Sequence, residues 1–143
     1  MLDFLQGKTF QLNGSILGFE ECNEFSIKVV EENSHFAYLQ SLEHDYISFL
    51  VISPFTADQD YSFEIEEKDK KLLEIEAPED VCVLTIVTTT DPFTDSTINL
   101  IAPILLNMKN GQGKQTVLPP SSRYSTKEPL FKVVQLESGE LSC

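Results

Sequence analysis

Most of the chain consists of strand-like runs, and some of them alternate apolar and polar residues with the two-residue period of a half-buried β-strand. Residues 25–30, FSIKVV, begin this way and are rich in β-branched side chains. Two more runs, residues 36–42 and 46–53, flank the polar tripeptide 43–45, which is the pattern of a β-hairpin. Pro54 ends the second run because proline cannot donate to a strand ladder. The pattern therefore predicts three strands, the last two paired as a hairpin.

The second half of the chain contains three further strand-like runs: residues 61–65, 81–90 and 97–108. Pro103 within the third run marks an edge or a bulge. Between the first two runs, residues 66–80 are rich in helix formers and carry acids before lysines, the order that a helix dipole favours. Leu72 and Leu73 give this stretch a narrow apolar stripe, and Pro78 ends it. We expect one short surface helix here.

The glycine-rich stretch NGQGKQT at residues 110–116 resembles the beginning of a phosphate-binding loop. That loop requires glycine six places before its lysine and a Ser or Thr directly after it, but the chain has Met108 and Gln115 there. A strand-like run and two prolines follow, where the loop would open into a helix. Asn-Gly between apolar runs instead favours a tight turn. We expect a hairpin that joins residues 98–108 to residues 114–118.

These elements predict an all-β, mainly antiparallel fold: a small β-barrel-like domain with one or two short helices. The chain has 143 residues, which is enough for one domain with a sizeable core. From Pro119 on the composition becomes polar, which favours an extended arm over core. We place the domain at residues 1–130 and a C-terminal arm, extended or flexible, at residues 131–143.

The chain is strongly acidic, with 23 Asp and Glu against 10 Lys and Arg and a net charge of −13. Such a charge repels phosphate backbones and argues against direct binding to nucleic acid. It speeds association with basic proteins instead. Solubility alone is the plainer explanation, because net charge governs solubility and association rates rather than fold.

Cysteine usage and the N-terminus indicate a cytoplasmic protein. Cys22, Cys82 and Cys143 lie far apart without CxxC spacing, which favours a reducing compartment over a disulfide framework. The first ten residues, MLDFLQGKTF, do not have the pattern of a signal peptide. Apolar runs such as VCVLTIV are far shorter than the roughly 18 residues of a membrane span, so we expect no membrane association.

No motif predicts catalysis, a cofactor, a metal or a small-molecule substrate. GSILG at 14–18 has its serine one place too early for a nucleophile elbow, and DQD at 58–60 lacks the later glycine and glutamate of a calcium loop. His35 and His44 have no metal-ligand spacing. We therefore expect a protein that is not an enzyme. An unrecognised enzyme that uses either histidine as a general base remains a competing hypothesis.

Several stretches, in order and at matching spacing, resemble the flagellar assembly factor family FliW. The specific ones are LQSLE followed by ISPF, then NLIAPI, G-x-GKQ and RYST-x-x-PL. The resemblance runs from about residue 14 to residue 130, and the glycine loop belongs to it as a turn. The matching pieces are GFEE (18–21), YLQSLEHDYISFLVISPF (38–55), DYSFEI (60–65), APEDVCVLTIVT (77–88), STINLIAPILLNMKNGQGKQ (96–115) and SRYSTKEPL (122–130).

The resemblance implies a protein that acts by binding other proteins. FliW-like proteins bind CsrA, a small basic dimeric RNA-binding regulator that represses translation of flagellin messenger RNA, and they also bind flagellin. Flagellin that accumulates in the cytoplasm occupies FliW and leaves CsrA free to repress; export of flagellin frees FliW to capture CsrA. The antagonism is noncompetitive, because FliW contacts CsrA away from its RNA surface. An export chaperone that chiefly protects flagellin is the alternative.

We expect the CsrA-binding face among exposed acids near the predicted helix and the strand before it. Aromatic side chains often anchor the centre of such interfaces, and two of them lie close to these acids in the sequence. A solvated acidic face is the competing interpretation of the acids. The expected partner-binding residues are Tyr46, Phe55, Asp58, Asp60, Glu64, Glu66, Glu67 and Asp69.

Overall fold

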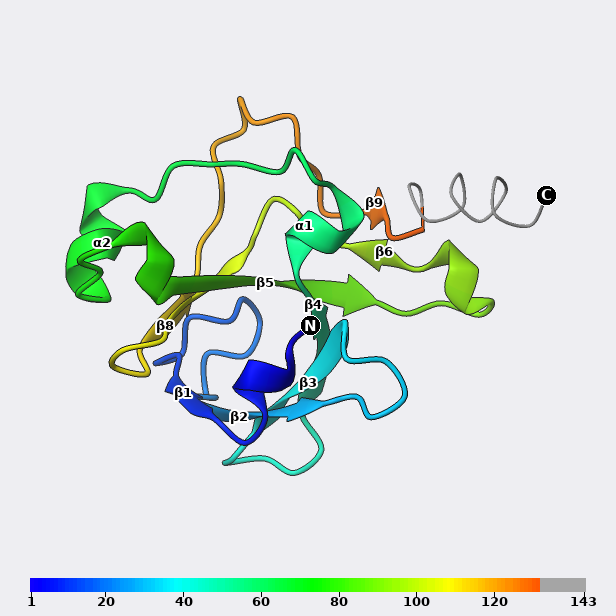
Figure 1. The fold of residues 1–143 in the computed structure, drawn as a ribbon, viewed down its shortest axis with the longest axis horizontal. Coiled ribbons are helices and arrows are strands. Elements are labelled where there is room, and N and C mark those ends of the chain that lie inside the picture. The colour runs from blue at the N-terminus through cyan, green and yellow to red at the C-terminus, as the bar shows by residue number, and fades with distance from the viewer. Residues whose placement is uncertain (132–143) are drawn as a thin grey trace.

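A computed structural model describes residues 1–131 as one antiparallel sheet of nine strands with two short α-helices (Figure 1). Three short 3-10 helices, η1 to η3, precede β1, β5 and β6. The expected arm at residues 131–143 lies outside the described part except for its first residue. The strands are β1 (Thr9–Gln11), β2 (Glu24–Val29), β3 (Phe36–Ser41), β4 (Ser48–Ile52), β5 (Val81–Thr88), β6 (Thr97–Ile98), β7 (Ile104–Asn107), β8 (Gly113–Gln115) and β9 (Glu128–Pro129). The helices are α1 (Pro54–Ala57), α2 (Glu67–Leu72), η1 (Asp3–Leu5), η2 (Pro78–Asp80) and η3 (Phe93–Asp95).

The sheet confirms the predicted all-β, barrel-like class. Strands β1 to β5 pair in chain order, and β5 then pairs with both β6 and β7 on its other side. Strand β8 continues from β7 and approaches β1, where the Gln11 N–H donates to the Gly111 carbonyl at 2.8 Å. Only one isolated bridge, Gln11 to Gln112, connects the two ends within the described residues, so ladders do not close the barrel.

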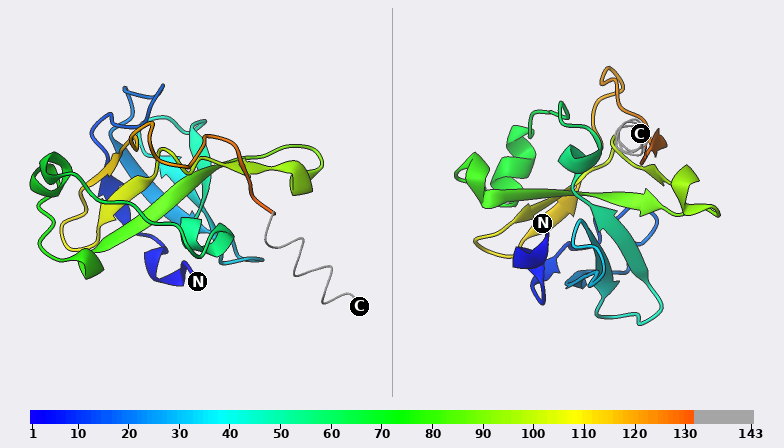
Figure 2. Two further views of the ribbon diagram at one scale, coloured as in Figure 1. Left: turned by 90° about the horizontal axis from the view of Figure 1, so that it is seen from above. Right: turned by 45° about the vertical axis from the view of Figure 1, so that its right-hand side comes forward.

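Strand β5 runs between the part of the sheet formed by β1 to β4 and the part of the chain that contains α1 (Figure 2), and a hydrophobic core lies on each side of it. The larger core lies inside the curved sheet around Phe25, Leu39 and Leu84, which are fully buried. The smaller core lies on the other side of β5, beneath α1 and the long loops. Its buried members are Ile52, Ala57, Tyr61, Val87, Ile98, Leu100, Leu118 and Leu130.

The predicted hairpins are both present. Strands β3 and β4 pair antiparallel around residues 42–47, and β7 and β8 pair around the Asn-Gly turn. Gly111 has a φ of +76°, which glycine adopts without steric cost. A Cβ at Gly113 would lie 2.5 Å from the Leu12 side chain, so glycine is required there for close packing. The glycines of the loop therefore serve the turn and the core.

Residues 61–65 were expected to form a strand, and that prediction is wrong: no ladder includes them. Their apolar and polar positions still alternate between buried and exposed, because the segment packs against the smaller core. The Tyr61 hydroxyl donates to the Leu100 carbonyl at 2.7 Å, and the Ser62 N–H donates to the Tyr124 hydroxyl at 3.0 Å. Burial raises the pKa of Tyr61. Contacts with other loops therefore replace a ladder here.

The run 97–108 was expected to be one strand, but it forms two. Strand β6 pairs with Val87 and Thr88, and β7 pairs with residues 81–84, so residues 99–103 oppose only residues 85–86 of β5. Pro103 ends this insertion directly before β7. The extra residues carry Leu100 into the smaller core.

One strand was missed, and two other expectations need extension. Strand β1 was not predicted, since its three residues are too short for a period to show. Pro54 does end β4, and it also begins α1. The polar segment after Pro119 is not simply an arm. Leu130 is buried, and β9 pairs with β6.

Candidate protein-binding surface

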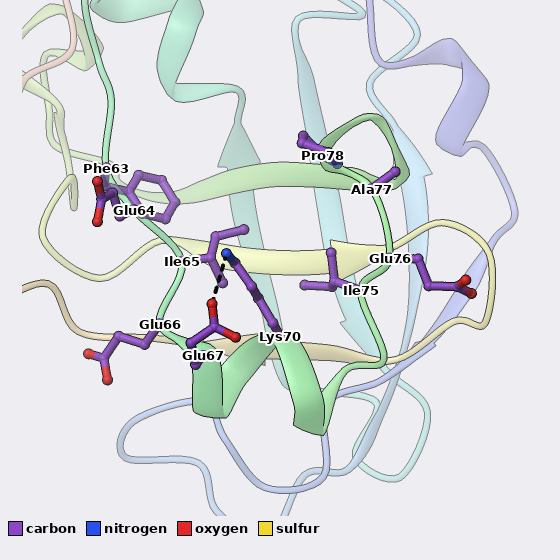
Figure 3. A pocket seen from close by; sticks show the side chains of 10 residues that line it. All are labelled: Phe63, Glu64, Ile65, Glu66, Glu67, Lys70, Ile75, Glu76, Ala77 and Pro78. Carbon is purple, nitrogen blue, oxygen red and sulfur yellow. Dashed lines mark hydrogen bonds and ion pairs between the residues drawn. The ribbon is translucent and has the colours of Figure 1, made fainter.

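An open groove of about 660 Å³ lies beside α2 (Figure 3). The extended residues 63–66, the first turns of α2 and residues 75–78 form its walls. The Ile65 and Ile75 side chains are half-buried and lie between the acidic ones. The lining residues are Phe63, Glu64, Ile65, Glu66, Glu67, Lys70, Ile75, Glu76, Ala77 and Pro78. We call this surface the acidic groove.

The acidic groove carries a net negative charge. All four of its glutamates, Glu64, Glu66, Glu67 and Glu76, are exposed. Lys70 is the one basic side chain among the described residues that line it, and it pairs with Glu67 at 3.3 Å. An apolar floor with acidic edges suits a partner surface that combines apolar and basic side chains.

The first turn of α2 is anchored by a buried carboxylate rather than by apolar side chains alone. Asp69 is 1% exposed; it pairs with Lys114 and accepts a hydrogen bond from the Thr116 hydroxyl at 3.1 Å. Leu73 is buried, whereas Leu72 is exposed, so the predicted stripe of two leucines reduces to one. The expectation of an exposed acid is therefore wrong for Asp69, which ties α2 to the strand β8 and the residue after it.

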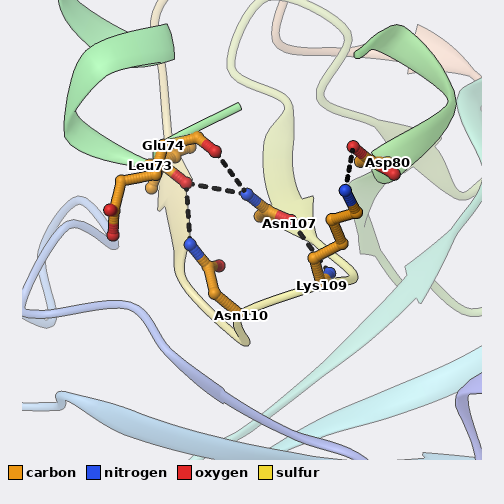
Figure 4. A network of polar contacts seen from close by, with 6 residues as sticks. All are labelled: Leu73, Glu74, Asp80, Asn107, Lys109 and Asn110. Atoms are coloured by element: carbon orange, nitrogen blue, oxygen red, sulfur yellow. Dashed lines mark hydrogen bonds and ion pairs between the residues drawn. The ribbon is translucent and has the colours of Figure 1, made fainter. Parts of the chain in front are cut away.

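The C-terminal end of α2 is capped by the turn between β7 and β8 (Figure 4). Asn107 and Asn110 donate side-chain N–H bonds to the Leu73 carbonyl at 2.8 Å and 3.1 Å. Glu74 comes next with a φ of +55°, and the Ile75 N–H reaches back to the Lys70 carbonyl at 2.8 Å. This is the Schellman arrangement, in which a left-handed residue ends a helix. The cap fixes where Ile75 and Glu76 meet the groove.

Residue 80 belongs to the same network. Lys109 lies 3.7 Å from the Asp80 carboxylate, and the Met108 N–H donates to the Asp80 carbonyl at 2.8 Å (Figure 4). The segment from 73 to 80 is thus held against the β7–β8 hairpin at both of its ends, and Asp69 ties α2 to the same hairpin, so two of the three wall segments of the acidic groove rest on it.

The structure brings three of the expected partner-binding residues together. Glu64, Glu66 and Glu67 line the acidic groove. Asp58 and Asp60 lie in the loop between α1 and α2, where the Asp58 side chain accepts the Asp60 N–H at 3.0 Å. This local bond is typical of an Asx turn. Three of the five acids that precede Asp69 in the set therefore share one surface.

The two expected aromatic anchors lie apart from that groove. Tyr46 is 82% exposed in the β3–β4 turn, at the opposite end of β4 from α1. Phe55 is 46% exposed on α1 and contacts the ring of Tyr61, with 5.8 Å between ring centroids. The sequence did not single out Ile65, Ile75 or Glu76. The alternation in EIE at 74–76 was the available signal, because it exposes acids on either side of an apolar residue.

Within residues 1–131, no three His, Cys, Asp or Glu side chains gather closely enough to hold a metal ion. The same residues contain no helix long and apolar enough to cross a membrane. The fold and the groove define a small antiparallel β-domain with an open acidic surface.

Comparison with known proteins identifies the family. The family model for the FliW protein matches residues 2–130. The chain is 44% identical over 115 residues to the flagellar assembly factor FliW of Bacillus subtilis (strain 168), which covers 80% of each protein. It is 36% identical over its whole length to the factor of the same name from Clostridium kluyveri (strain NBRC 12016), of which it covers 94%. A crystal structure of the flagellar assembly factor FliW matches with a TM-score of 0.79 at 33% identity and covers 85% of this chain and 84% of the other.

The chain belongs to the FliW family. The resemblance found in the motifs is thereby confirmed, and so is the fold. These relatives are named for flagellar assembly rather than for a chemical reaction.

Proposed function

We propose that this domain is a protein-binding regulator of flagellum assembly in the cytoplasm. It binds the translational repressor CsrA, antagonises it noncompetitively, and also binds flagellin, so that the flagellin level controls flagellin translation. Membership of the FliW family supports the role in flagellum assembly. The acidic groove is the observation that carries the CsrA contact, because it offers a basic partner four exposed carboxylates around two isoleucines.

The acids act chiefly on the rate of encounter. Exposed charges that face an oppositely charged partner raise the association rate, and salt screens them. Ile65 and Ile75 supply the apolar contact that slows dissociation. CsrA held at this groove keeps its RNA surface outside the contact, as a noncompetitive mechanism requires. Asp58 and Asp60 extend the acidic field along the loop before α2, while Tyr46 and Phe55 serve as separate aromatic contacts.

The decisive experiment is calorimetry of the purified protein titrated with CsrA, repeated after saturation with flagellin. We expect binding to CsrA that prior flagellin abolishes. Binding to flagellin alone, without heat from CsrA, would favour the export-chaperone alternative. If the calorimeter detected no binding of either CsrA or flagellin, the proposal would be wrong.

A charge-reversal pair locates the contact. Glu66→Lys lies on the acidic groove, and Glu32→Lys is its matched control, an exposed acid in the β2–β3 turn. We expect the first variant to lower the association rate with CsrA about tenfold and the second to change it little. If both variants lowered the association rate equally, the contact would lie elsewhere, and the overall charge of the domain alone would explain the effect. A variant with both His35 and His44 replaced by Asn should bind normally, which separates binding from the enzyme hypothesis.

A further inference from the structure

Strand β4 ends opposite Thr85, so the first residues of β5 have no neighbouring strand on the side where β4 lies. The two strands pair only through Val51–Ile86 and Ile52–Thr85. If the two strands continued in the same register, the next hydrogen-bonded pair would be Pro54 and Val83. Pro54 has no N–H and begins α1 instead, where its carbonyl accepts the Asp58 N–H at 2.9 Å.

The register on the other side of β5 shows which backbone groups are left over. The bond from the Met108 N–H to the Asp80 carbonyl, with the β5–β7 pairing, directs the even-numbered residues of β5 toward β7. The backbone N–H and carbonyl groups of Val81 and Val83 therefore point away from β7, to the side of β5 where β4 has already ended. The Val81 N–H bonds to the Pro78 carbonyl. Within residues 1–131, no hydrogen bond reaches the N–H or carbonyl of Val83 or the carbonyl of Val81.

These groups open onto a second groove of about 570 Å³ with mainly apolar walls. Phe4, Phe55 and Met108 line this groove, and both phenylalanines are about half exposed. In Figure 1 β5 crosses between α1 and the N-terminal segment. Strand edge and apolar walls together match an extended peptide, whose side chains alternate between its two faces.

The charges around this edge define the kind of peptide. Glu79 lines the groove next to the beginning of β5 and forms no ion pair within the described part of the chain, whereas the N-terminal amine is paired with Asp3 at 2.8 Å. An antiparallel addition places the C-terminal end of the incoming strand beside Glu79, so a basic side chain fits there. A second copy of this chain is disfavoured because each copy carries a net charge of −13.

We propose that the open edge of β5 at residues 81–83 is a docking site for an extended segment of a protein partner. The segment adds to the sheet antiparallel to β5, carries apolar side chains at alternate positions, and ends with a basic residue. Val83 exchanges two hydrogen bonds with it, and the Val81 carbonyl accepts a third. This inference rests on the proposed function only in assuming that the domain works by binding proteins.

Amide hydrogen exchange of the full-length chain, read residue by residue by NMR, tests the site directly. In the free protein the Val83 amide should exchange much faster than those of Cys82 and Leu84, which bond to β7. Saturation with purified flagellin or purified CsrA, tested separately, should slow exchange at Val83 at least about tenfold while leaving Cys82 and Leu84 protected. A partner that binds without protecting Val83 would overturn the docking site but not the proposed function. If neither protein binds, both proposals fail.

The free protein tests the other occupants. If the Val83 amide is already protected from exchange in the isolated protein, the proposal is overturned. The edge of β5 is then occupied by another segment of the same chain or by a second copy. Protection that grows with protein concentration would identify the second copy, and protection independent of concentration would identify a segment of the same chain.

Two variants add an independent readout. Val83→Pro removes the N–H on the open side and should weaken binding of the protecting partner at least about tenfold, provided that its circular dichroism spectrum is native. Glu79→Lys leaves the backbone intact and should weaken the same partner several-fold, with Glu32→Lys as control. Unchanged affinity in both folded variants would overturn the proposal.

Discussion

At the scale of single residues, burial separates acids that look alike in the sequence. Glu67 and Asp69 are two positions apart on α2, yet the first is exposed and paired with Lys70 while the second is buried against Lys114. An exposed ion pair contributes little to stability, because water and salt screen it. A buried one leaves an uncompensated charge when either partner is removed.

Asp69→Asn should therefore destabilise the fold markedly. We expect a loss of about 3 kcal/mol in the free energy of unfolding, because Lys114, with 24% of its side chain exposed, loses its counter-charge. Urea denaturation of the two proteins measures the difference. Glu67→Gln is the matched control and should cost less than about 0.5 kcal/mol. Similar losses in both variants would mean that Asp69 is solvated in solution.

Cys82 provides a second test at this scale. Burial raises the pKa of its thiol to about 11, so the reactive thiolate is scarce at neutral pH and increases only as the pH approaches that value. In a Cys143→Ser background, we expect Cys82 to react with iodoacetamide at pH 8 about a hundredfold more slowly than a free cysteine. Mass spectrometry of the alkylated protein measures the rate. A rate equal to that of a free thiol would contradict the burial of this side chain.

At the scale of elements, short pieces of secondary structure depend on contacts with segments distant in the chain. Helix α2 has six residues, far fewer than an isolated helix requires in water. Its end is fixed by Asn107 and Asn110 from the β7–β8 turn and by the left-handed conformation of Glu74. The β7–β8 hairpin, whose tight turn the Asn-Gly pair predicts, thus also caps α2, a helix far away in the sequence.

Glu74→Gly should stabilise the protein. A residue with a side chain has a steric penalty at a φ of +55°, and glycine avoids most of it. We expect the free energy of unfolding to rise by about 1 kcal/mol, measured by denaturation in urea. Glu76→Gly, at an exposed neighbouring position without a positive φ, should be neutral or destabilising. Destabilisation by Glu74→Gly would show that the glutamate side chain makes a contact worth more than the strain.

At the scale of the whole molecule, charge and topology act together. The net charge of −13 creates a field around the entire domain, while the hairpin of β7 and β8 supports the parts of the acidic groove formed by α2 and residues 75–78. The field attracts any basic partner, and the groove gives the contact a location. A specific contact with one basic protein requires both properties, because charge alone does not discriminate among basic proteins.

The association rate with CsrA should therefore fall steeply with salt. Raising the ionic strength from about 0.1 M to about 1 M shortens the Debye length from about 10 Å to about 3 Å. We expect the association rate constant to fall at least about tenfold and the dissociation rate constant to change much less. Stopped-flow fluorescence or surface plasmon resonance measures both constants. Salt that acts mainly on dissociation would indicate a few buried ion pairs in place of a general field.

Much of the fold could be predicted from local pattern. Alternation located β2, the hairpin pattern located β3 and β4, and a continuous β-branched run located β5, while the Asn-Gly pair located the β7–β8 turn. These patterns are properties of short segments of the chain. The candidate site was only partly predictable. Glu64, Glu66 and Glu67 were found as acids near a helix, but Ile75 and Glu76 join them through a helix cap that depends on Asn107 and Asn110.

The class of fold, the acidic field and the family follow from the sequence alone, since these depend on composition, periodicity and motifs along the chain. Three features depend on contacts made in the folded chain: residues 61–65 lie outside the sheet, residues 97–108 divide into two strands, and Asp69 is buried. The folded chain also decides that β4 stops short and leaves the backbone of Val83 open. Alternation tells which side chains are buried, but which strand or loop buries them depends on contacts between segments far apart in the chain.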